Sequence, residues 1–178
     1  MKTKVALLDE VTLNRAVVRM SHEIIEKNKG IDDVVLVGIR TRGVPMAERI
    51  GEQIKRIEGV ELKIGSIDIT HFRDDVSANE RTSVNATDIK FDIHNKNVIL
   101  CDDVLFTGRT ARAAIEALLH FGRPKTIQLA VLIDRGHREL PIRADYVGKN
   151  IPTSLQETVA VKFDETDGET CAILCETD

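Results

Sequence analysis

The chain has 178 residues, of which 42% are hydrophobic and 30% charged, and its formal net charge is −4. This composition is typical of one globular domain with a full hydrophobic core, and it excludes a disordered chain or a membrane-spanning one. A protein that binds nucleic acid with its whole surface is usually basic, so the charge supports no such surface and leaves room only for a local basic patch.

In chain order, the first predicted element is a helix over about residues 12–28, where apolar residues recur every three or four positions. Its exposed side carries Arg15, Arg19 and His22, which fall on a common face. A continuous apolar run at residues 34–37 follows and predicts a buried parallel strand.

Residues 38–43 predict a tight basic loop, and the next helix begins near Pro45, close to its first position, and ends at Gly59. Residues 62–72 predict a strand. The polar segment 73–87 lacks periodicity, and a long segment of this kind beside a ligand site is typical of a mobile lid. Residues 88–93 then fit the returning arm of a hairpin.

The most informative segment starts with four apolar residues at 98–101, which lead directly into Asp102 and Asp103. A Thr/Gly/Thr turn at residues 107–110 then opens onto a helical pattern. Parallel α/β sheets bind ligands at the carboxyl ends of their strands, and the unpaired N–H groups of a helix start suit a phosphate. Paired carboxylates suit sugar hydroxyls or a metal. The segment therefore offers groups for both ends of a phosphorylated sugar.

Another buried strand is predicted at residues 127–133, and it ends at a polar turn over 134–138. Alternating residues at 159–163 and an apolar stretch at 171–175 predict an edge hairpin rather than a new domain. The repeated strand–loop–helix order predicts an α/β fold with a mainly parallel central sheet flanked by helices, in a single domain over residues 1–178.

The three cysteines lack metal-site partners at a convincing spacing, which favours reduced thiols. The first residues also lack the apolar stretch of a secretion signal. We therefore expect a cytoplasmic protein that contacts no membrane.

Other readings of Asp102 and Asp103 stay open. Two acids after a strand also bind helix starts or surface arginines, and the strand of an ATPase that binds magnesium ends in acids as well. That last reading needs a G-x-x-x-x-G-K-[ST] loop, and a dinucleotide fold needs G-x-G-x-x-G after its first strand. Neither motif occurs in this chain.

Residues 98–110 resemble the phosphoribosyl-diphosphate (PRPP) signature of type I phosphoribosyltransferases, which is a strand, two acids and a T-G-x-T turn. More narrowly, the chain resembles the pyrimidine operon regulators, bacterial RNA-binding attenuators that also carry uracil phosphoribosyltransferase activity. The supporting segments are residues 9–10, 37–43, 68–70, 73–75, 134–146 and 148–154. Phe72 departs from the family, where a tyrosine is expected before Arg-Asp-Asp, and the lid is a few residues short.

The resemblance implies the type I phosphoribosyltransferase fold with a small hood. It assigns Asp102 and Asp103 to the ribose hydroxyls, beside the positive charge that develops on the sugar, and only indirectly to Mg²⁺, through those hydroxyls or water. The loop around the 5′-phosphate would consist of Leu105, Phe106, Thr107, Gly108, Arg109 and Thr110. For Arg109 the alternative is that only its amide functions while its side chain lies in solvent.

The diphosphate would bind to Arg40, Thr41 and Arg42, with Arg73 of the lid closing over it and excluding water. Arginines in such a loop are otherwise often simply solvated. The Mg²⁺ cofactor would bridge diphosphate oxygens and ribose hydroxyls.

Uracil would lie beyond the turn formed by Asp134, Arg135 and His137, and would be recognised mainly by backbone groups. Arg135 is the side chain most expected to contact the base, although an ion pair with Asp134 or Glu139 is the alternative. His137 equally fits a packed structural role.

The resemblance also implies that a leader mRNA hairpin of pyrimidine genes binds a concave basic patch, in response to UMP or UTP. Helix faces normally carry charge, so the patch by itself is weak support. A homodimer or larger homo-oligomer is expected. Alternatives are a salvage enzyme without RNA function, an RNA regulator with vestigial catalysis, and a purine-specific transferase. The patch would comprise Arg15, Arg19, His22, Arg138, Arg143 and Lys149.

Overall fold

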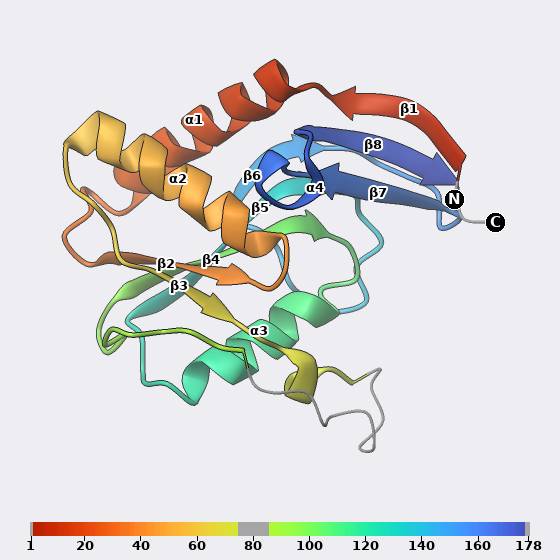
Figure 1. Ribbon diagram of the computed structural model, residues 1–178. Helices are drawn as coiled ribbons and strands as arrows, with labels where there is room; N and C mark the ends of the chain where they lie inside the picture. The colour runs from red at the N-terminus through yellow and green to blue at the C-terminus, as the bar shows by residue number, and fades with distance from the viewer. Residues whose placement is uncertain (1, 75–85, 177–178) are drawn as a thin grey trace.

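A computed structural model describes residues 2–74 and 86–176 of the chain, which form two sheets and the helices that connect their strands (Figure 1). In chain order the elements are β1 (Lys2–Leu8), α1 (Glu10–Lys27), β2 (Val34–Ile39), α2 (Gly43–Glu58), β3 (Ile64–Ile67), the 3₁₀ turn η1 (Thr70–Phe72), β4 (Asn97–Leu105), α3 (Arg109–Leu119), β5 (Thr126–Asp134), β6 (Tyr146–Asn150), β7 (Glu157–Lys162), α4 (Asp164–Asp167) and β8 (Cys171–Glu176).

The larger sheet has five strands in the order β3-β2-β4-β5-β6, and every neighbouring pair is parallel. This confirms the mainly parallel central sheet. Strand β4 lies in the middle, where residues 98–101 are fully buried. All five strands point the same way, so the loops that follow them emerge at one edge of the sheet.

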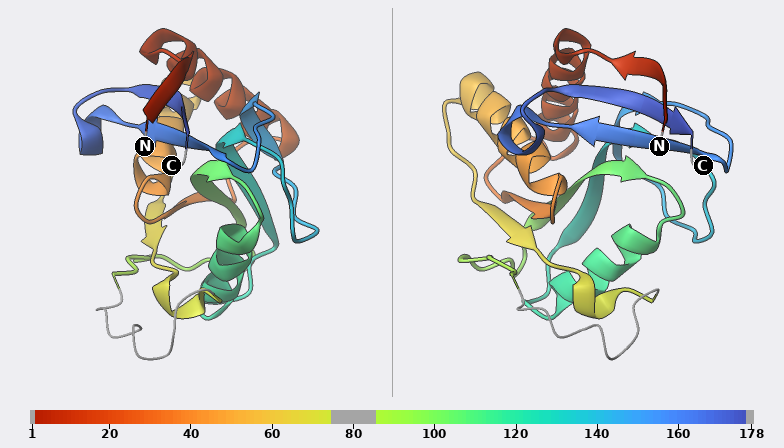
Figure 2. Two further views of the ribbon diagram at one scale, coloured as in Figure 1. Left: turned by 90° about the vertical axis from the view of Figure 1, so that its right-hand side faces the viewer. Right: turned by 45° about the vertical axis from the view of Figure 1, so that its right-hand side comes forward.

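Helices α1 and α2 cover one face of this sheet and α3 covers the other (Figures 1 and 2). On the first face, Ile99 belongs to a core with Met20 of α1 and Ile50 of α2. On the second face, Leu100 packs in a core with Leu118 of α3. Successive residues of β4 thus serve opposite faces, which is why this strand is apolar throughout.

The smaller sheet is antiparallel, has the order β1-β8-β7 and forms the hood. The predicted hairpin near residues 159–175 is confirmed as β7 and β8. Its partner β1 was not predicted from the sequence pattern.

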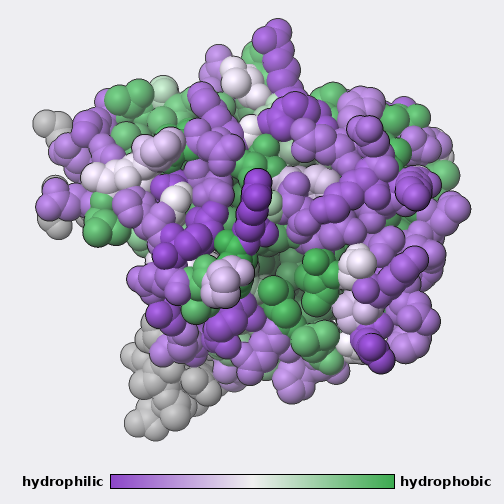
Figure 3. Space-filling view, turned by 180° about the vertical axis from the view of Figure 1, so that it is seen from behind, coloured by the Kyte–Doolittle hydropathy of each residue, from purple (hydrophilic) through white to green (hydrophobic). Residues whose placement is uncertain are grey.

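Polar side chains dominate the face in Figure 3, with hydrophobic ones gathered around a hollow near its middle.

Several predicted boundaries were wrong. The strand expected over 62–72 covers only Ile64–Ile67, because Asp68 accepts hydrogen bonds from the backbone and the hydroxyl of Thr70 and turns the chain into η1. Residues 88–93 make one isolated bridge, from Asp88 to Ser66, in place of a hairpin arm. Helix α1 begins earlier than expected, at Glu10, since Asp9 caps the backbone N–H of Thr12.

Residues 75–85 of the expected lid lie outside the described residues, and its mobility stays a prediction. Within the described part of the chain, none of the helices combines the length and the apolar character needed to cross a bilayer.

Candidate functional site

The loops after β2, β4 and β5 meet at the carboxyl edge of the parallel sheet. A β-carbon built on Gly43, at the end of the first loop, would stand 3.3 Å from the Cα of Asp102. The backbone N–H of Arg135 in the third loop donates to the carbonyl of Leu105, at a distance of 3.0 Å. The structure therefore brings together the segments predicted to hold ribose, phosphate, diphosphate and base.

Asp102 and Asp103 lie inside β4 rather than after it, because the strand continues to Leu105. This corrects the expected end of the strand at residue 101. Each carboxylate accepts a hydrogen bond from the next backbone N–H along the chain, Asp102 from Asp103 and Asp103 from Val104, both at 2.9 Å. The two side chains are partly buried, and the Asp103 carboxylate lies close enough to Asp102 to act on it electrostatically.

Asp102 lines a cavity of about 90 Å³ together with Thr107, Gly108 and Thr110. A cavity of this size has room for more than one water molecule or for a small polar group. Burial and the neighbouring charge of Asp103 raise the pKa of Asp102. A donor or cation that enters the cavity would relieve the electrostatic cost of this carboxylate.

The turn before α3 has the geometry of an anion site. Gly108 takes the left-handed conformation with φ of 93° and immediately precedes the helix, whose first N–H groups have no partner within the helix. The hydroxyl of Thr107 accepts from the N–H of Arg109 at 3.3 Å, which tightens the turn. Phe106 lines the same cavity, as does Leu105.

The Arg109 side chain bridges two other loops. Its Nε donates to Glu139 at 2.7 Å and its Nη1 to Asp74 at 2.6 Å. These ion pairs differ from the alternative in which the side chain only meets solvent. In this conformation Arg109 links the turn before α3 to the loops on either side of it.

The loop after β2 is pressed against β4. Arg40 donates from Nε to the Ser66 hydroxyl at 3.3 Å, and Arg42 donates from Nη2 to Asp167 of the hood at 2.9 Å. The peptide bond between Arg40 and Thr41 is cis. The structure thus gives both arginines protein partners, and it describes Arg73 near the same edge, after η1.

Gly43→Ala tests this close approach. The new β-carbon would stand 2.2 Å from the Cys101 carbonyl oxygen, so β4 or the loop must move. We expect the free energy of unfolding to fall by about 1–3 kcal/mol in a denaturant titration. Gly59→Ala is the control, because a β-carbon there meets nothing within 4 Å and only the left-handed backbone is strained. A Gly43→Ala protein with unchanged stability would contradict the geometry.

A second cavity, of about 440 Å³, opens after β5 beside the first, within the size range of small-molecule sites. The predicted base-site residues Asp134, Arg135 and His137 all line it. Three other residues of its wall, Asn150, Pro152 and Thr153, had no role predicted from the sequence, although they belong to the segment 148–154 that carries the family resemblance. Gly136 and Arg138 complete the wall.

Arg135 is 5% exposed, and its guanidinium holds the chain that follows β6. Its Nε donates to the Thr153 hydroxyl at 3.0 Å and its Nη2 to the carbonyls of Ser154 and Glu157. It also lies 4.0 Å above the ring of Phe106, and burial lowers its pKa. Neither ion pair considered for Arg135 is among these contacts, and its contact with a base stays a prediction.

His137 and Arg138 belong to the same turn. The exposed His137 ring contacts the Thr153 carbonyl through Nε2 and meets Phe106 edge-on, so it is held in the turn but not buried there. Arg138 pairs with Asp134 and donates to the carbonyl of Phe106 at 2.7 Å. The base-side turn and the phosphate-side turn are therefore bonded to each other.

The predicted basic patch is only partly assembled. Arg15, Arg19 and Lys149 line one hollow of about 330 Å³ between α1 and β6, together with Gly148. Arg19 donates to Glu23 at 2.8 Å and to the Gly148 carbonyl, so its guanidinium is already oriented there.

The other members of the patch lie outside this hollow. His22 and Arg143 are exposed, whereas the side chain of Arg138 is only 24% exposed and braces the turn described above. A role of Arg138 in RNA binding therefore requires that this bracing contact and an RNA contact coexist.

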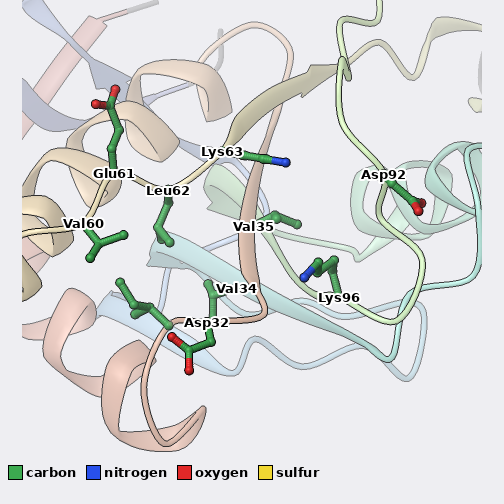
Figure 4. Close-up of a pocket in the computed structure, with 10 residues that line it drawn as sticks. Asp32, Val34, Val35, Val60, Glu61, Leu62, Lys63, Asp92 and Lys96 are labelled. Atoms are coloured by element: carbon green, nitrogen blue, oxygen red, sulfur yellow. The ribbon is translucent and has the colours of Figure 1, made fainter.

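A further hollow, of about 320 Å³, lies at the opposite edge, where β2 begins (Figure 4). Val34, Val35 and Leu62 contribute apolar walls, and Lys96 on its rim is paired with Asp33 at 2.8 Å. None of the predicted site residues lines it. Ligands of open α/β sheets bind at the other end of the strands, so we assign it no part in the site.

The donor set of the site fits a loosely held Mg²⁺. Among residues 2–74 and 86–176 no group of three or more His, Cys, Asp or Glu side chains could hold a metal by itself. The carboxylates of Asp102 and Asp103 nevertheless supply hard oxygen acceptors for the waters that Mg²⁺ commonly keeps, which suits an indirect contact.

The fold and the paired turns define a phosphoribosyltransferase domain, and the family model described as phosphoribosyl transferase domain matches residues 6–165. The Bifunctional protein PyrR of Caldicellulosiruptor bescii is 62% identical over 169 residues, which cover 94% of this chain and 93% of that protein. That of Clostridium beijerinckii is 59% identical over 170 residues, covering 95% and 96%. The chain belongs to the PyrR family of phosphoribosyltransferases.

The solved structures support the fold alone. A hypoxanthine-guanine phosphoribosyltransferase from Bacillus anthracis superposes with a TM-score of 0.72 at 20% identity, covering 99% of this chain and 100% of that one. The hypoxanthine phosphoribosyltransferase of Trypanosoma cruzi gives a TM-score of 0.74 at 19% identity, covering 99% and 98%.

Proposed function

We propose that this protein converts uracil and PRPP to UMP and diphosphate, and that it also regulates pyrimidine genes by binding a leader mRNA hairpin when a uridine nucleotide is bound. One observation carries the enzymatic part: Asp102 and the Thr107–Thr110 turn line one cavity, and a larger cavity lies next to it, with Arg138 of its wall bonded to the Phe106 carbonyl. The name of the relatives, bifunctional protein, supports two activities.

The transferase reaction breaks the bond between ribose C1 and diphosphate, forms a bond between C1 and N1 of uracil and releases the N1 proton with the diphosphate, while positive charge builds on the sugar. Asp102 and Asp103 accept hydrogen bonds from the ribose hydroxyls and stabilise that charge. The first N–H groups of α3 and the Thr107 and Thr110 hydroxyls hold the 5′-phosphate. Asp102 and Asp103 would hold Mg²⁺ indirectly, through water or the ribose hydroxyls, and the metal would supply positive charge for the leaving group.

The leaving diphosphate binds the loop of Arg40, Thr41 and Arg42, whose distance from the acids is set by the contact of Gly43 with β4. Uracil enters the cavity formed after β5. Its polar atoms meet backbone groups of the turn that Asp134 fixes by accepting from the N–H of Gly136 at 3.0 Å. The guanidinium of Arg135 holds this wall in place through its hydrogen bonds to Thr153 and Ser154.

RNA binds the hollow lined by Arg15, Arg19 and Lys149, through phosphates and through stacking of unpaired bases on guanidinium planes. The bonds between the phosphate-side and base-side turns support the coupling to nucleotide. Arg138 bonds the Phe106 carbonyl, and the N–H groups of Glu139 and Leu140 donate to the Thr107 carbonyl. A nucleotide favours RNA only if it binds the RNA-competent state more tightly.

Two assays on the purified protein test the proposal. The rate of nucleotide formation from PRPP is measured with uracil, hypoxanthine and guanine in turn. We expect turnover with uracil and none with the two purines. A gel shift with pyrimidine leader RNA is run with and without UMP at two salt concentrations, and we expect tighter binding with UMP and weaker binding at high salt.

Each alternative has its own result in these assays. Turnover without an RNA shift identifies a dedicated salvage enzyme. A UMP-dependent shift without turnover identifies a regulator with vestigial catalysis. Phe72 packs 5.2 Å from the His120 ring and lacks the tyrosine hydroxyl of the family pattern, which makes this second outcome informative. Purine turnover would overturn the proposed substrate. Light scattering tests the expected homo-oligomer.

A further inference from the structure

Two ion pairs fasten the hood to helix α2. Arg49 binds Glu165 with two hydrogen bonds of 2.9 Å each, and Arg42 binds Asp167 at 2.9 Å. Both acids belong to α4, the short turn that joins β7 to β8 and lies beside the start of α2 (Figure 1). Only the second pair involves the loop assigned to diphosphate. The two pairs are therefore chemically similar but differ in their place relative to the site.

Asp167 is a fixed acceptor. Its Oδ2 accepts from the backbone N–H of Phe163 at 3.0 Å and from the Thr166 hydroxyl at 2.8 Å, which leaves Oδ1 to Arg42. Its side chain is 18% exposed, and Phe163 is fully buried in the core. The hydrogen bond from Phe163 lowers the pKa of Asp167, together with Thr166 and Arg42, so the carboxylate is ionised at neutral pH.

Arg42 is the adaptable partner. Its side chain is 44% exposed, and it uses Nη2 for Asp167. A guanidinium has five N–H donors, and among the described residues no second acceptor of Arg42 is found. The neighbouring Gly43 is in close contact with the backbone of Cys101 and Asp102, so the base of this side chain is held beside the reacting groups.

We propose that Asp167 is a positioning residue for PRPP, which holds the Arg42 guanidinium in place so that its remaining donors meet the diphosphate. Holding a long side chain in advance lowers the entropy that substrate binding must otherwise remove. Asp167 itself does not touch the substrate. The inference rests on the proposed role of the Arg40–Arg42 loop in diphosphate binding.

Asp167→Asn removes the charge and keeps the size of the side chain. Exposed ion pairs of this kind are worth a factor of up to about five in an equilibrium constant. We expect the KM for PRPP to rise about two- to fivefold, with kcat and the KM for uracil changed less than about twofold. Calorimetric titration with PRPP and Mg²⁺ should show the same loss of affinity. Asp167→Glu should recover part of it.

Glu165→Gln is the matched control, because it breaks the neighbouring pair on the same turn without touching the diphosphate loop. It should leave the KM for PRPP unchanged. Arg42→Gln should raise that KM more than Asp167→Asn, and adding Asp167→Asn to Arg42→Gln should then have no further effect.

The outcomes separate the two ideas. If Arg42→Gln raises the KM but Asp167→Asn behaves like Glu165→Gln, only the positioning role falls. A lower KM in Asp167→Asn would also overturn it, because the carboxylate would then repel the diphosphate. If Arg42→Gln leaves the KM for PRPP unchanged, Arg42 does not bind the diphosphate, and the positioning role of Asp167 is then wrong as well.

Discussion

Asp102→Asn should lower kcat/KM for UMP formation by a factor of at least about 100, the usual effect of removing one preorganised electrostatic group. The asparagine keeps an oxygen that can accept from the N–H of Asp103, so β4 should stay intact. What it loses is the negative charge beside the ribose carbon as positive charge builds there. Steady-state rates with saturating uracil and varied PRPP measure the effect.

The same variant should be more stable than the wild type at neutral pH. Burial and Asp103 raise the pKa of Asp102 in the folded state above the value of about 4 that it has in the unfolded chain. The unfolded chain therefore ionises first as the pH rises, and the folded state loses stability from about pH 4 up to the raised pKa. Removing the carboxylate removes this cost, and we expect a gain of about 0.5–2 kcal/mol that disappears in acid. Thermal unfolding at several pH values measures it.

Asp33→Asn, at the opposite edge of the sheet, is the control for both measurements. Its carboxylate is paired with Lys96, which lowers its pKa, so its loss should reduce stability slightly at neutral pH and leave UMP formation unchanged. Wild-type activity in Asp102→Asn would contradict the proposal that the ribose binds beside Asp102 in this cavity.

Arg15→Gln combined with Arg19→Gln should weaken binding of the leader RNA by a factor of about 100 at moderate salt. Each lost phosphate contact should also reduce the slope of log affinity against log salt by about one. The reason is that the two guanidinium groups and Lys149 converge on one hollow, where they neutralise RNA phosphates together. Gel shifts across a salt series, with UMP present, measure both quantities.

Arg56→Gln is a matched control for this experiment. Arg56 pairs with Glu52 four residues earlier on α2, as Arg19 pairs with Glu23 on α1, but it does not line the hollow between α1 and β6. Arg56→Gln should not change RNA affinity, and UMP formation should stay normal in both this variant and the double variant. Equal weakening in Arg56→Gln would mean that RNA responds only to total charge and not to this hollow.

The amino-acid sequence by itself determined the part of the site that is contiguous in the chain. Strand β4, the turn at residues 107–110 and helix α3 follow one another directly, so apolar runs, adjacent acids and a glycine turn identify them without knowledge of the rest. Buried parallel strands are apolar on both faces, which made β2, β4 and β5 predictable for the same reason.

Only the tertiary structure decided which distant groups meet. Strand β1 was missed because its partner β8 lies at the other end of the chain, and the pairing of Lys2 with Glu176 has no local signal. The contacts of Arg109 with Glu139, of Arg135 with the segment after β6, and of Arg42 with Asp167 have the same origin. A charged residue in a loop looks alike in sequence whether it meets solvent, a substrate or a carboxylate, because packing of the whole chain chooses its partner.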